Sequence, residues 1–275
     1  MARQRLGQHF LADAGWREEI ARAIRVSQQS IAPAASGNSA EFCWIEIGAG
    51  HGEMTEHLAS TGAPVHAIEL DPLLAAALKR LAKRFPNLEI VSADILESDI
   101  SKISAGKRVR VYGNLPYYIT SPILHHLFAS ADLIDEIHIV IQHEVALRLA
   151  ARPGTRDYGY LSVLTQYFSR PELVLEIPRG AFRPPPEVSS ALATLRFPGE
   201  RAKIPQVDEE AFLEFVKSCF AQKRKTLVNN LKSRVELELV REALANLKLR
   251  SDTRAEQLSV ANLVAVFHQL EIART

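Results

Sequence analysis

Short apolar runs alternate with helix-length stretches through the first half of the chain. The runs that have the length and composition of buried strands are FCWIEI (42–47), VHAIEL (65–70), LEIVSA (88–93), VRVYGN (109–114) and IHIVIQ (137–142). The clearest helix follows Pro72, and its apolar positions at i, i+3, i+4 and i+7 are Leu74, Ala77, Leu78 and Leu81. Near-continuous apolar strands joined by helices are typical of a parallel sheet covered on both faces. The pattern therefore predicts a doubly wound, Rossmann-like α/β domain.

The pattern changes in the second half. Apolar runs at 172–177 and 190–197 predict two late strands, which could form a hairpin at the edge of the sheet. Next comes PGERAKIPQVD, whose proline, glycine and charged residues are typical of a linker. Two amphipathic helices are predicted beyond it, with stripes of Phe212, Phe215, Val216, Cys219 and Phe220 and of Val260, Leu263, Val264, Phe267 and Leu270. We predict an α/β domain over 1–198, a linker over 199–207 and a smaller all-helical domain over 208–275.

Composition excludes several classes of protein. With 275 residues, 47% of them hydrophobic, the chain can bury a large core, so disorder is excluded as its main state. No apolar run approaches the roughly 18 residues of a membrane-spanning helix, and MARQRLGQHF carries no apolar signal segment. Cys43 and Cys219 lack the spacing of a zinc site or a disulfide framework. We expect a cytoplasmic monomer with buried cysteines and no metal or membrane partner.

Charge is informative only through its distribution. The chain has 33 Lys and Arg against 32 Asp and Glu, so its net charge indicates no partner. From Val216 to Val235, however, there are six basic residues and no acidic one. A solvated helix face is the ordinary explanation of such a run, but a cluster of this kind also suits phosphates.

A glycine-rich turn, EIGAGHG (46–52), follows the first predicted strand. Such a turn lets a ligand approach the backbone closely and has a helix N-terminus behind it, although it can also be purely structural. A dinucleotide-binding turn needs its third glycine at position 53, where this chain has Glu53, and a carboxylate beside a pyrophosphate is unfavourable. The turn favours S-adenosylmethionine, which has a ribose and a sulfonium cation but no phosphate.

Acidic residues end the next two predicted strands. Glu69 lies where a carboxylate could accept both ribose hydroxyls, and Asp94 lies where it could accept from the adenine amino group. Each could instead be a helix cap or a turn residue. Because the carboxyl ends of parallel strands line one crevice, three consecutive signals favour a cofactor site.

The tetrapeptide NLPY (114–117) ends the fourth predicted strand, at the same crevice. The exocyclic amine of a base is a poor nucleophile because its lone pair is delocalised into the ring, and acceptors on its N–H groups free that pair. Asn114 Oδ1 and the Leu115 carbonyl are candidate acceptors. Pro116 would shape the turn, and Tyr117 could stack on the base. The motif favours methyl transfer to an amine over an ordinary Asn-Pro turn.

Together with GQHFL (7–11), FRPPPEVSS (182–190), KRKTLVNNLK (223–232) and RAEQLS (254–259), these motifs resemble the ribosomal RNA adenine dimethylase family over nearly the whole chain, most closely its small-subunit branch. The resemblance implies S-adenosylmethionine-dependent dimethylation of N6 of two adjacent adenosines in the 3′-terminal hairpin loop of 16S rRNA. It also implies action on the small (30S) ribosomal subunit or its precursor and a role in subunit biogenesis. A large-subunit RNA methylase, an assembly factor that needs no catalysis, and a dinucleotide oxidoreductase remain as alternatives.

The resemblance also implies roles for individual residues. The catalytic set is Asn114, Leu115, Pro116, Tyr117 and Phe182, of which Tyr117 and Phe182 would stack on the flipped base, with core packing as the alternative for Phe182. The cofactor set is Gln8, His9, Leu11, Gly48, Gly50, Glu69, Asp94, Ile95 and Asn114. His9 and Leu11 would close over the methionine end, and His9 stands where the family more often has asparagine. The RNA-binding set is Arg148, Arg183, Lys223, Arg224, Lys225 and Lys232.

Overall fold

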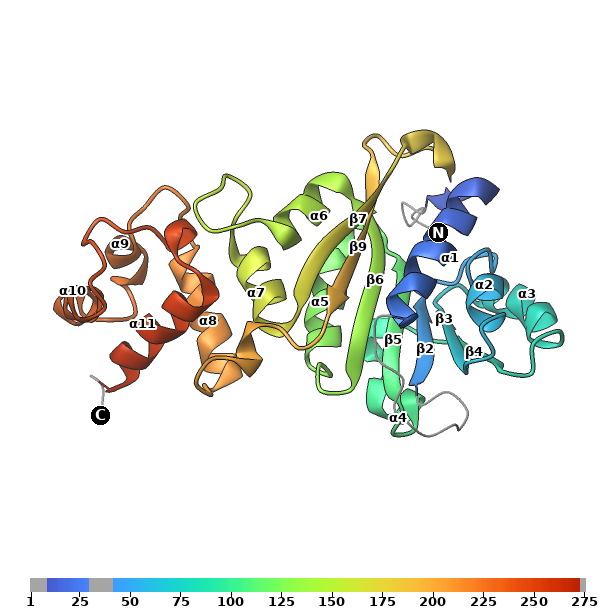
Figure 1. Cartoon of the computed structure of the whole chain (residues 1–275), viewed down its shortest axis with the longest axis horizontal. Helices are drawn as coiled ribbons and strands as arrows, with labels where there is room; N and C mark the ends of the chain where they lie inside the picture. Colours follow the sequence, from blue (N-terminus) through green and yellow to red (C-terminus); the bar gives the residue numbers. More distant parts are fainter. Residues whose placement is uncertain (1–8, 30–41, 273–275) are drawn as a thin grey trace, which may run out of the picture. The chain divides into compact units, whose positions relative to one another are not determined.

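The computed structural model of the chain describes residues 9–29 and 42–272 (Figure 1). Contacts within the chain divide it into two compact units. The first comprises the residues up to Ala146 together with 172–197, and the second comprises 147–171 together with the residues from Pro198 onward. The second unit thus takes in 147–171, which the predicted boundaries assign to the first domain, because helix α7 (Tyr160–Phe168) packs against helices of the C-terminal part. The division into an enzyme domain and an RNA-binding domain stays a prediction.

A seven-stranded sheet forms the centre of the first unit, in the order β4-β3-β2-β5-β6-β9-β7. Its strands are β2 (Phe42–Ile47), β3 (Val65–Glu69), β4 (Leu88–Ser92), β5 (Arg108–Asn114), β6 (Ile134–Gln142), β7 (Arg170–Ile177) and β9 (Ser190–Arg196). The helices of this part are α1 (Ala14–Gln29), α2 (Thr55–Ala59), α3 (Pro72–Ala82), α4 (Ile100–Ser104), α5 (Thr120–Phe128) and the first half of α6 (His143–Ala150), which the unit boundary after Ala146 divides. Strands β2 to β6 run parallel and β9 runs antiparallel to β6, so the predicted doubly wound sheet with a late edge is confirmed.

The strand order reverses between β2 and β5. From β2 the chain builds outward through β3 and β4, then returns to the other side of β2 and builds outward through β5 and β6. Ligands of open α/β sheets bind beyond the carboxyl ends of the strands at such a reversal. Because Ile47 pairs with Gly113, the residues that follow, Gly48 and Asn114, lie side by side at the carboxyl ends of β2 and β5. The fold therefore brings the glycine-rich turn and NLPY together.

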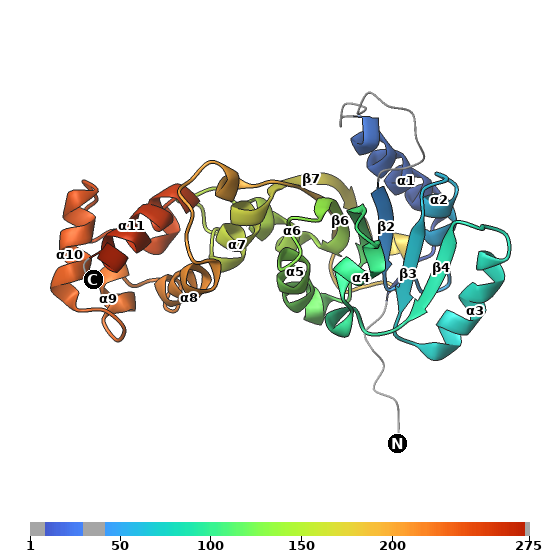
Figure 2. The ribbon, with the colours of Figure 1, turned by 90° about the horizontal axis from the view of Figure 1, so that it is seen from below.

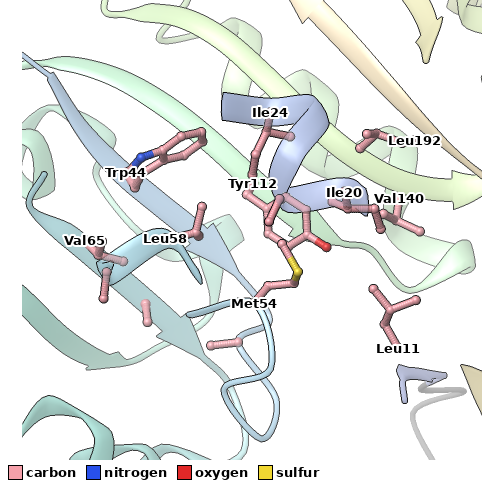
Figure 3. Close-up of a cluster of buried hydrophobic side chains, with 14 of the residues drawn as sticks. Leu11, Ile20, Ile24, Trp44, Met54, Leu58, Val65, Tyr112, Val140 and Leu192 are labelled. Carbon is pink, nitrogen blue, oxygen red and sulfur yellow. The ribbon is translucent and has the colours of Figure 1, made fainter. Parts of the chain in front are cut away.

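One face of the sheet is covered by α1, α2 and α3. Figure 2 shows α1 and α2 on one side of the strands and α5 on the other. Figure 3 shows Ile20 and Ile24 of α1 beside Trp44, Tyr112 and other buried side chains of the same cluster. In α3, Asp71 caps the first turn by accepting from the Leu73 N–H at 2.8 Å. The apolar stripe predicted for α3 is partly wrong, since Ala75 is buried and Ala77 is exposed. The reason is that the helix presents a slightly rotated face to the sheet.

The second unit is helical. Besides α7 it contains α8 (Glu209–Cys219), α9 (Leu227–Leu231), α10 (Leu237–Asn246) and α11 (Val260–Ile272). The predicted stripes of α8 and α11 are buried, with Phe220, the residue after α8, only partly so. Within the described ranges, no helix combines the length and the apolar composition that a membrane crossing requires.

Candidate active site

Two cavities open at the carboxyl ends of β2, β3 and β5, and both are lined by Gly48 and Pro116. The first, the Asn114 cavity, is lined by His9, Phe10, Gly48, Gly50, Asn114, Leu115, Pro116 and Tyr117. The second, the Asp94 cavity, is lined by Ile47, Gly48, Ile68, Glu69, Leu70, Ala93, Asp94, Ile95, Pro116, Tyr118, Ile119 and Ile123. The structure thus brings together every described cofactor candidate except Leu11. Gln8 lies outside the described residues.

The glycine-rich turn offers its backbone to both cavities. Gly48 has a φ of +70°, and a Cβ built on it would meet no atom within 4 Å, so its missing side chain leaves open space in the cavities. Gly50 has a φ of +59°, and a Cβ there would lie 3.2 Å from the Phe10 ring. Both positions therefore need glycine, one for ligand space and the other for close packing.

The Glu69 carboxylate is fixed by the backbone around it. Its Oε2 accepts from the Gly50 N–H at 2.8 Å and its Oε1 from the Asp71 N–H at 2.9 Å, and the side chain is only 2% exposed. Each carboxylate oxygen has a second lone pair for a further donor. Glu69 therefore ties the glycine-rich turn to β3 and still has acceptor capacity in the Asp94 cavity.

Asp94 combines the two roles that the sequence left open. Its Oδ1 caps the short 3-10 turn Ile95–Glu97 by accepting from the Leu96 N–H at 2.9 Å. Among the described residues, none donates a hydrogen bond to its Oδ2. One oxygen thus positions the carboxylate and the other is available to a ligand amine in the cavity that Asp94 lines.

Asn114 is oriented by the N-terminal segment. Its Nδ2 donates to the His9 carbonyl oxygen at 2.8 Å, which settles which end of the amide is the nitrogen. None of the described residues donates a hydrogen bond to Oδ1, and Asn114 lines the cavity. The amide therefore presents an acceptor to a ligand, which is the role that amine activation requires.

Tyr117 begins a 3-10 turn, Tyr117–Ile119, immediately after Pro116. Its hydroxyl and Ser190 Oγ are 2.9 Å apart, and burial raises the pKa of Tyr117, with the Ser190 hydrogen bond opposing the rise. The side chain is therefore a neutral phenol whose ring is held beside the cavity. An aromatic ring in this position can stack on a base.

Two predicted site residues lie in the core instead. Strand β1 (Phe10–Leu11) pairs antiparallel with β8 (Phe182–Arg183), and Leu11 and Phe182 face each other across the pair. Leu11 is 4% exposed and Phe182 is 1% exposed, and both belong to the buried cluster. In this structure Phe182 has the core-packing role, and base stacking by Phe182 stays a prediction that requires its ring to become exposed.

Phe10 is the cavity residue that the sequence analysis missed. Successive side chains of a strand point to opposite faces, so when Leu11 enters the core, Phe10 faces the Asn114 cavity. Alternation along the strand separates Phe10 from Leu11, but it does not say which of the two faces the cavity. Leu70 and Tyr118 were also missed; they line the Asp94 cavity and are 51% and 62% exposed, as suits side chains that a planar ligand would cover.

Glu46, a buried residue of β2, makes the stability of the protein depend on pH. Burial, and then the nearby charges of Glu53 and Glu69, raise the pKa of Glu46 from 4.5 to about 8, against the lowering effect of the nearby Thr55 hydroxyl. Between these two values the folded protein holds a proton that the unfolded chain releases, so the free energy of unfolding falls as pH rises, by as much as about 1.4 kcal/mol per pH unit. Glu46→Gln should remove this dependence.

Urea unfolding of both proteins at pH 5.5 and pH 8 measures this effect. We expect the stability of the Glu46→Gln variant, relative to the unsubstituted protein, to rise between the two pH values. If the two proteins differ in free energy of unfolding by the same amount at both pH values, the Glu46 carboxyl does not titrate in this interval.

The basic segment of the second unit forms a loop rather than a helix face. Lys223, Arg224 and Lys225 lie exposed between α8 and α9. Asn230 fastens the loop, since its Nδ2 donates to the Cys219 carbonyl at 2.6 Å and its Oδ1 accepts from the Gln222 N–H at 3.2 Å. The loop thus presents three cations from a held backbone.

The other predicted RNA-binding residues are exposed as well. Lys232 follows α9, and Arg148 lies on α6, both in the second unit. Arg183 lies on β8 in the first unit, where its guanidinium donates to the Gly180 and Phe182 carbonyls. RNA binding by all these residues stays a prediction.

Comparisons with known proteins identify the family of the chain. The family model for ribosomal RNA adenine dimethylase matches residues 1–271. Ribosomal RNA small subunit methyltransferase A of Koribacter versatilis is 39% identical, covering 97% of this chain and 93% of that protein. The protein of the same name from Pseudomonas syringae pv. syringae is 38% identical, covering 96% of this chain and 92% of that protein.

Solved structures show the same fold. A dimethyladenosine transferase from Plasmodium falciparum superposes with a TM-score of 0.78 at 21% identity, covering 96% of this chain and 98% of that one. The 23S rRNA methyltransferase ErmE superposes with a TM-score of 0.68 at 26% identity, covering 95% of this chain and 99% of that one. The family model spans nearly the whole chain, and the two relatives are 39% and 38% identical over more than nine tenths of both proteins. The chain therefore belongs to the ribosomal RNA adenine dimethylase family.

Proposed function

We propose that this protein transfers two methyl groups from S-adenosylmethionine to N6 of each of two adjacent adenosines in the 3′-terminal hairpin loop of 16S rRNA, on the small ribosomal subunit or its precursor. One observation carries the proposal. Asn114 lies at the strand-order reversal with its nitrogen bound to the His9 carbonyl, so its oxygen is the free acceptor in a cavity that also contains the Tyr117 ring. Family membership and the small-subunit relatives support the choice of RNA.

The residues present fit the cofactor. Glu69 offers acceptors suited to two ribose hydroxyls, and Asp94 Oδ2 offers one suited to an adenine amino group. The open space at Gly48 lies between the two cavities and suits a ligand that extends from one into the other. When bound, S-adenosylmethionine supplies a methyl group on a sulfonium cation, which needs no metal ion or covalent enzyme intermediate to leave.

The residues of the Asn114 cavity would activate the amine. Asn114 Oδ1 accepts one N–H of the target amine and the Leu115 carbonyl is proposed to accept the other, which frees the nitrogen lone pair for attack. Tyr117 stacks on the base and restricts its orientation. Each transfer replaces one N–H of the amine by N–CH3 and releases that proton to solvent. After one transfer the amine keeps a single N–H, so one acceptor suffices for the second transfer.

Methylation at a pyrimidine carbon is not supported, because that reaction needs a thiolate nucleophile at the site. Both cysteines are buried, and burial raises the pKa of each thiol. Cys43 lies within β2 and Cys219 within α8, and neither lines the Asn114 or the Asp94 cavity.

The test of the function uses methyl transfer and ligand binding. Small subunits are isolated from cells lacking this protein and are incubated with the purified protein and labelled S-adenosylmethionine. Labelled methyl groups should then appear in their 16S rRNA, and not in free 23S rRNA treated in the same way. Labelling of 23S rRNA alone would favour the large-subunit alternative, and binding without any transfer would favour an assembly factor. S-adenosylmethionine should raise the melting temperature and NAD should not, whereas the reverse would indicate an oxidoreductase.

RNA affinity should fall with added salt if the basic loop contacts phosphates. Arg224→Ala and Lys225→Ala should each reduce the slope of log Kd against log salt by about one. Lys79→Ala, an exposed lysine of α3, is the matched control and should leave the slope unchanged. Equal slopes for all four proteins would remove the loop from the RNA interface.

A further inference from the structure

The His9 side chain lies against the ring that is proposed to receive the target base. The centroids of His9 and Tyr117 are 5.6 Å apart, with 29° between the ring planes, so the two rings are stacked. Both rings line the Asn114 cavity. An imidazole thus covers a Tyr117 face in the protein without RNA.

The ring and the backbone of His9 are held by separate contacts. The Nδ1–H donates to the Pro184 carbonyl at 2.8 Å, while the backbone carbonyl accepts from Asn114. The backbone continues directly into β1, which is paired with β8. The imidazole can therefore rotate away from Tyr117 at the cost of one stack and one hydrogen bond, without releasing Asn114.

A base cannot enter between the two rings as they lie. Carbon atoms in contact are about 3.5 Å apart, so a base between two rings needs about 7 Å between their planes. The 5.6 Å centroid distance is an upper limit on the present separation. At this face of Tyr117, His9 and a base exclude each other.

We propose that His9 is a specificity residue: its imidazole occupies the stacking face of Tyr117 until an adenine, which stacks over a larger area, replaces it. The inference rests on the proposed function. A pyrimidine has a single ring, like the imidazole, so its stack on Tyr117 gains little over the stack that it would replace. Its entry would also break the hydrogen bond between His9 and Pro184, so it leaves His9 in position. In RNA held by its phosphates, the stack thus selects which base enters the cavity.

The test follows the His9 ring resonances by NMR, with S-adenosylhomocysteine present so that no methyl is transferred. Tyr117→Leu, without RNA, gives the resonance position of an unstacked His9. A saturating RNA hairpin with two adjacent loop adenosines should move the resonances of the unsubstituted protein toward that position, with a further change from loss of the Pro184 hydrogen bond, which Tyr117→Leu keeps. The same hairpin with cytidines in place of those adenosines, also at saturation, should leave them unmoved. If neither hairpin moves them, or both do, the proposal is overturned.

Affinity gives a second measurement that does not need Tyr117→Leu to fold. His9→Ala should bind the adenosine hairpin at least about fivefold more tightly with saturating S-adenosylhomocysteine, because neither a stack of roughly 1 kcal/mol nor the hydrogen bond to Pro184 has to be broken. His66→Ala removes a histidine whose Nδ1 lies 3.0 Å from Glu89, outside both cavities, and should change nothing. Unchanged or weaker binding by His9→Ala would contradict the proposal. Methyl transfer to the hairpin, measured separately with S-adenosylmethionine, tests the proposed function itself.

Discussion

Replacing Asn114 by alanine is expected to lower the rate of methyl transfer by at least about 10²-fold, the effect of removing one hydrogen-bond partner from a preorganised reacting centre. The variant loses the acceptor that is proposed to free the amine lone pair, while the proposed cofactor contacts of Glu69 and Asp94 remain. RNA affinity should be largely kept, since phosphate contacts supply most of it. Single-turnover transfer with saturating enzyme, and RNA Kd from the same preparation, measure the two quantities.

The controls separate chemistry from folding. Asn262→Ala removes an exposed asparagine of α11 and should transfer methyl groups at the normal rate. Asn114→Asp keeps an acceptor but loses the N–H that binds the His9 carbonyl, so its rate should lie between that of the unsubstituted protein and that of Asn114→Ala. A normal rate for Asn114→Ala would refute the assigned role.

Glu69→Ala is expected to weaken S-adenosylmethionine binding by about 10²-fold. Hydrogen bonds to a charged acceptor are each worth about 1.5–3 kcal/mol, and the carboxylate is proposed to accept from both ribose hydroxyls. The substitution also leaves the Gly50 and Asp71 N–H groups without their acceptors, which loosens the turn beside the cofactor. Calorimetric titration with the cofactor gives the Kd of each protein.

A modified ligand distinguishes ribose recognition from a loosened turn. A 2′,3′-dideoxy analogue of S-adenosylhomocysteine lacks both hydroxyls, so the unsubstituted protein should bind it much more weakly than the parent compound. Glu69→Ala should bind the two ligands nearly equally. Glu89→Ala, which removes an exposed acid of β4, should behave as the unsubstituted protein does. If Glu69→Ala prefers the parent compound over the dideoxy analogue by the same factor as the unsubstituted protein, residues other than Glu69 bind the ribose hydroxyls.

Local sequence patterns were sufficient for most of the fold. Strands buried on both faces need near-continuous apolar runs, and the runs ending at Ile47, Glu69 and Asn114 have that composition, so their strands could be predicted. Parallel strands end at one edge, so the sequence alone predicts that Gly48, Glu69 and Asp94 are neighbours, and all three line the Asp94 cavity. The face of α3 was less certain, because an alanine-rich helix allows a small rotation without changing its pattern.

The sequence by itself determined the sheet, the helical C-terminal part and the residues at the strand ends, because these depend on composition and short-range periodicity. Only the tertiary structure decided how GQHFL and FRPPPEVSS interact. Their pairing as β1 and β8 directs Phe182 and Leu11 inward, turns Phe10 to the cavity, and sets His9 against Tyr117. Contacts between segments so far apart along the chain depend on how the whole unit packs, and no local pattern records which of two alternating side chains will face the core.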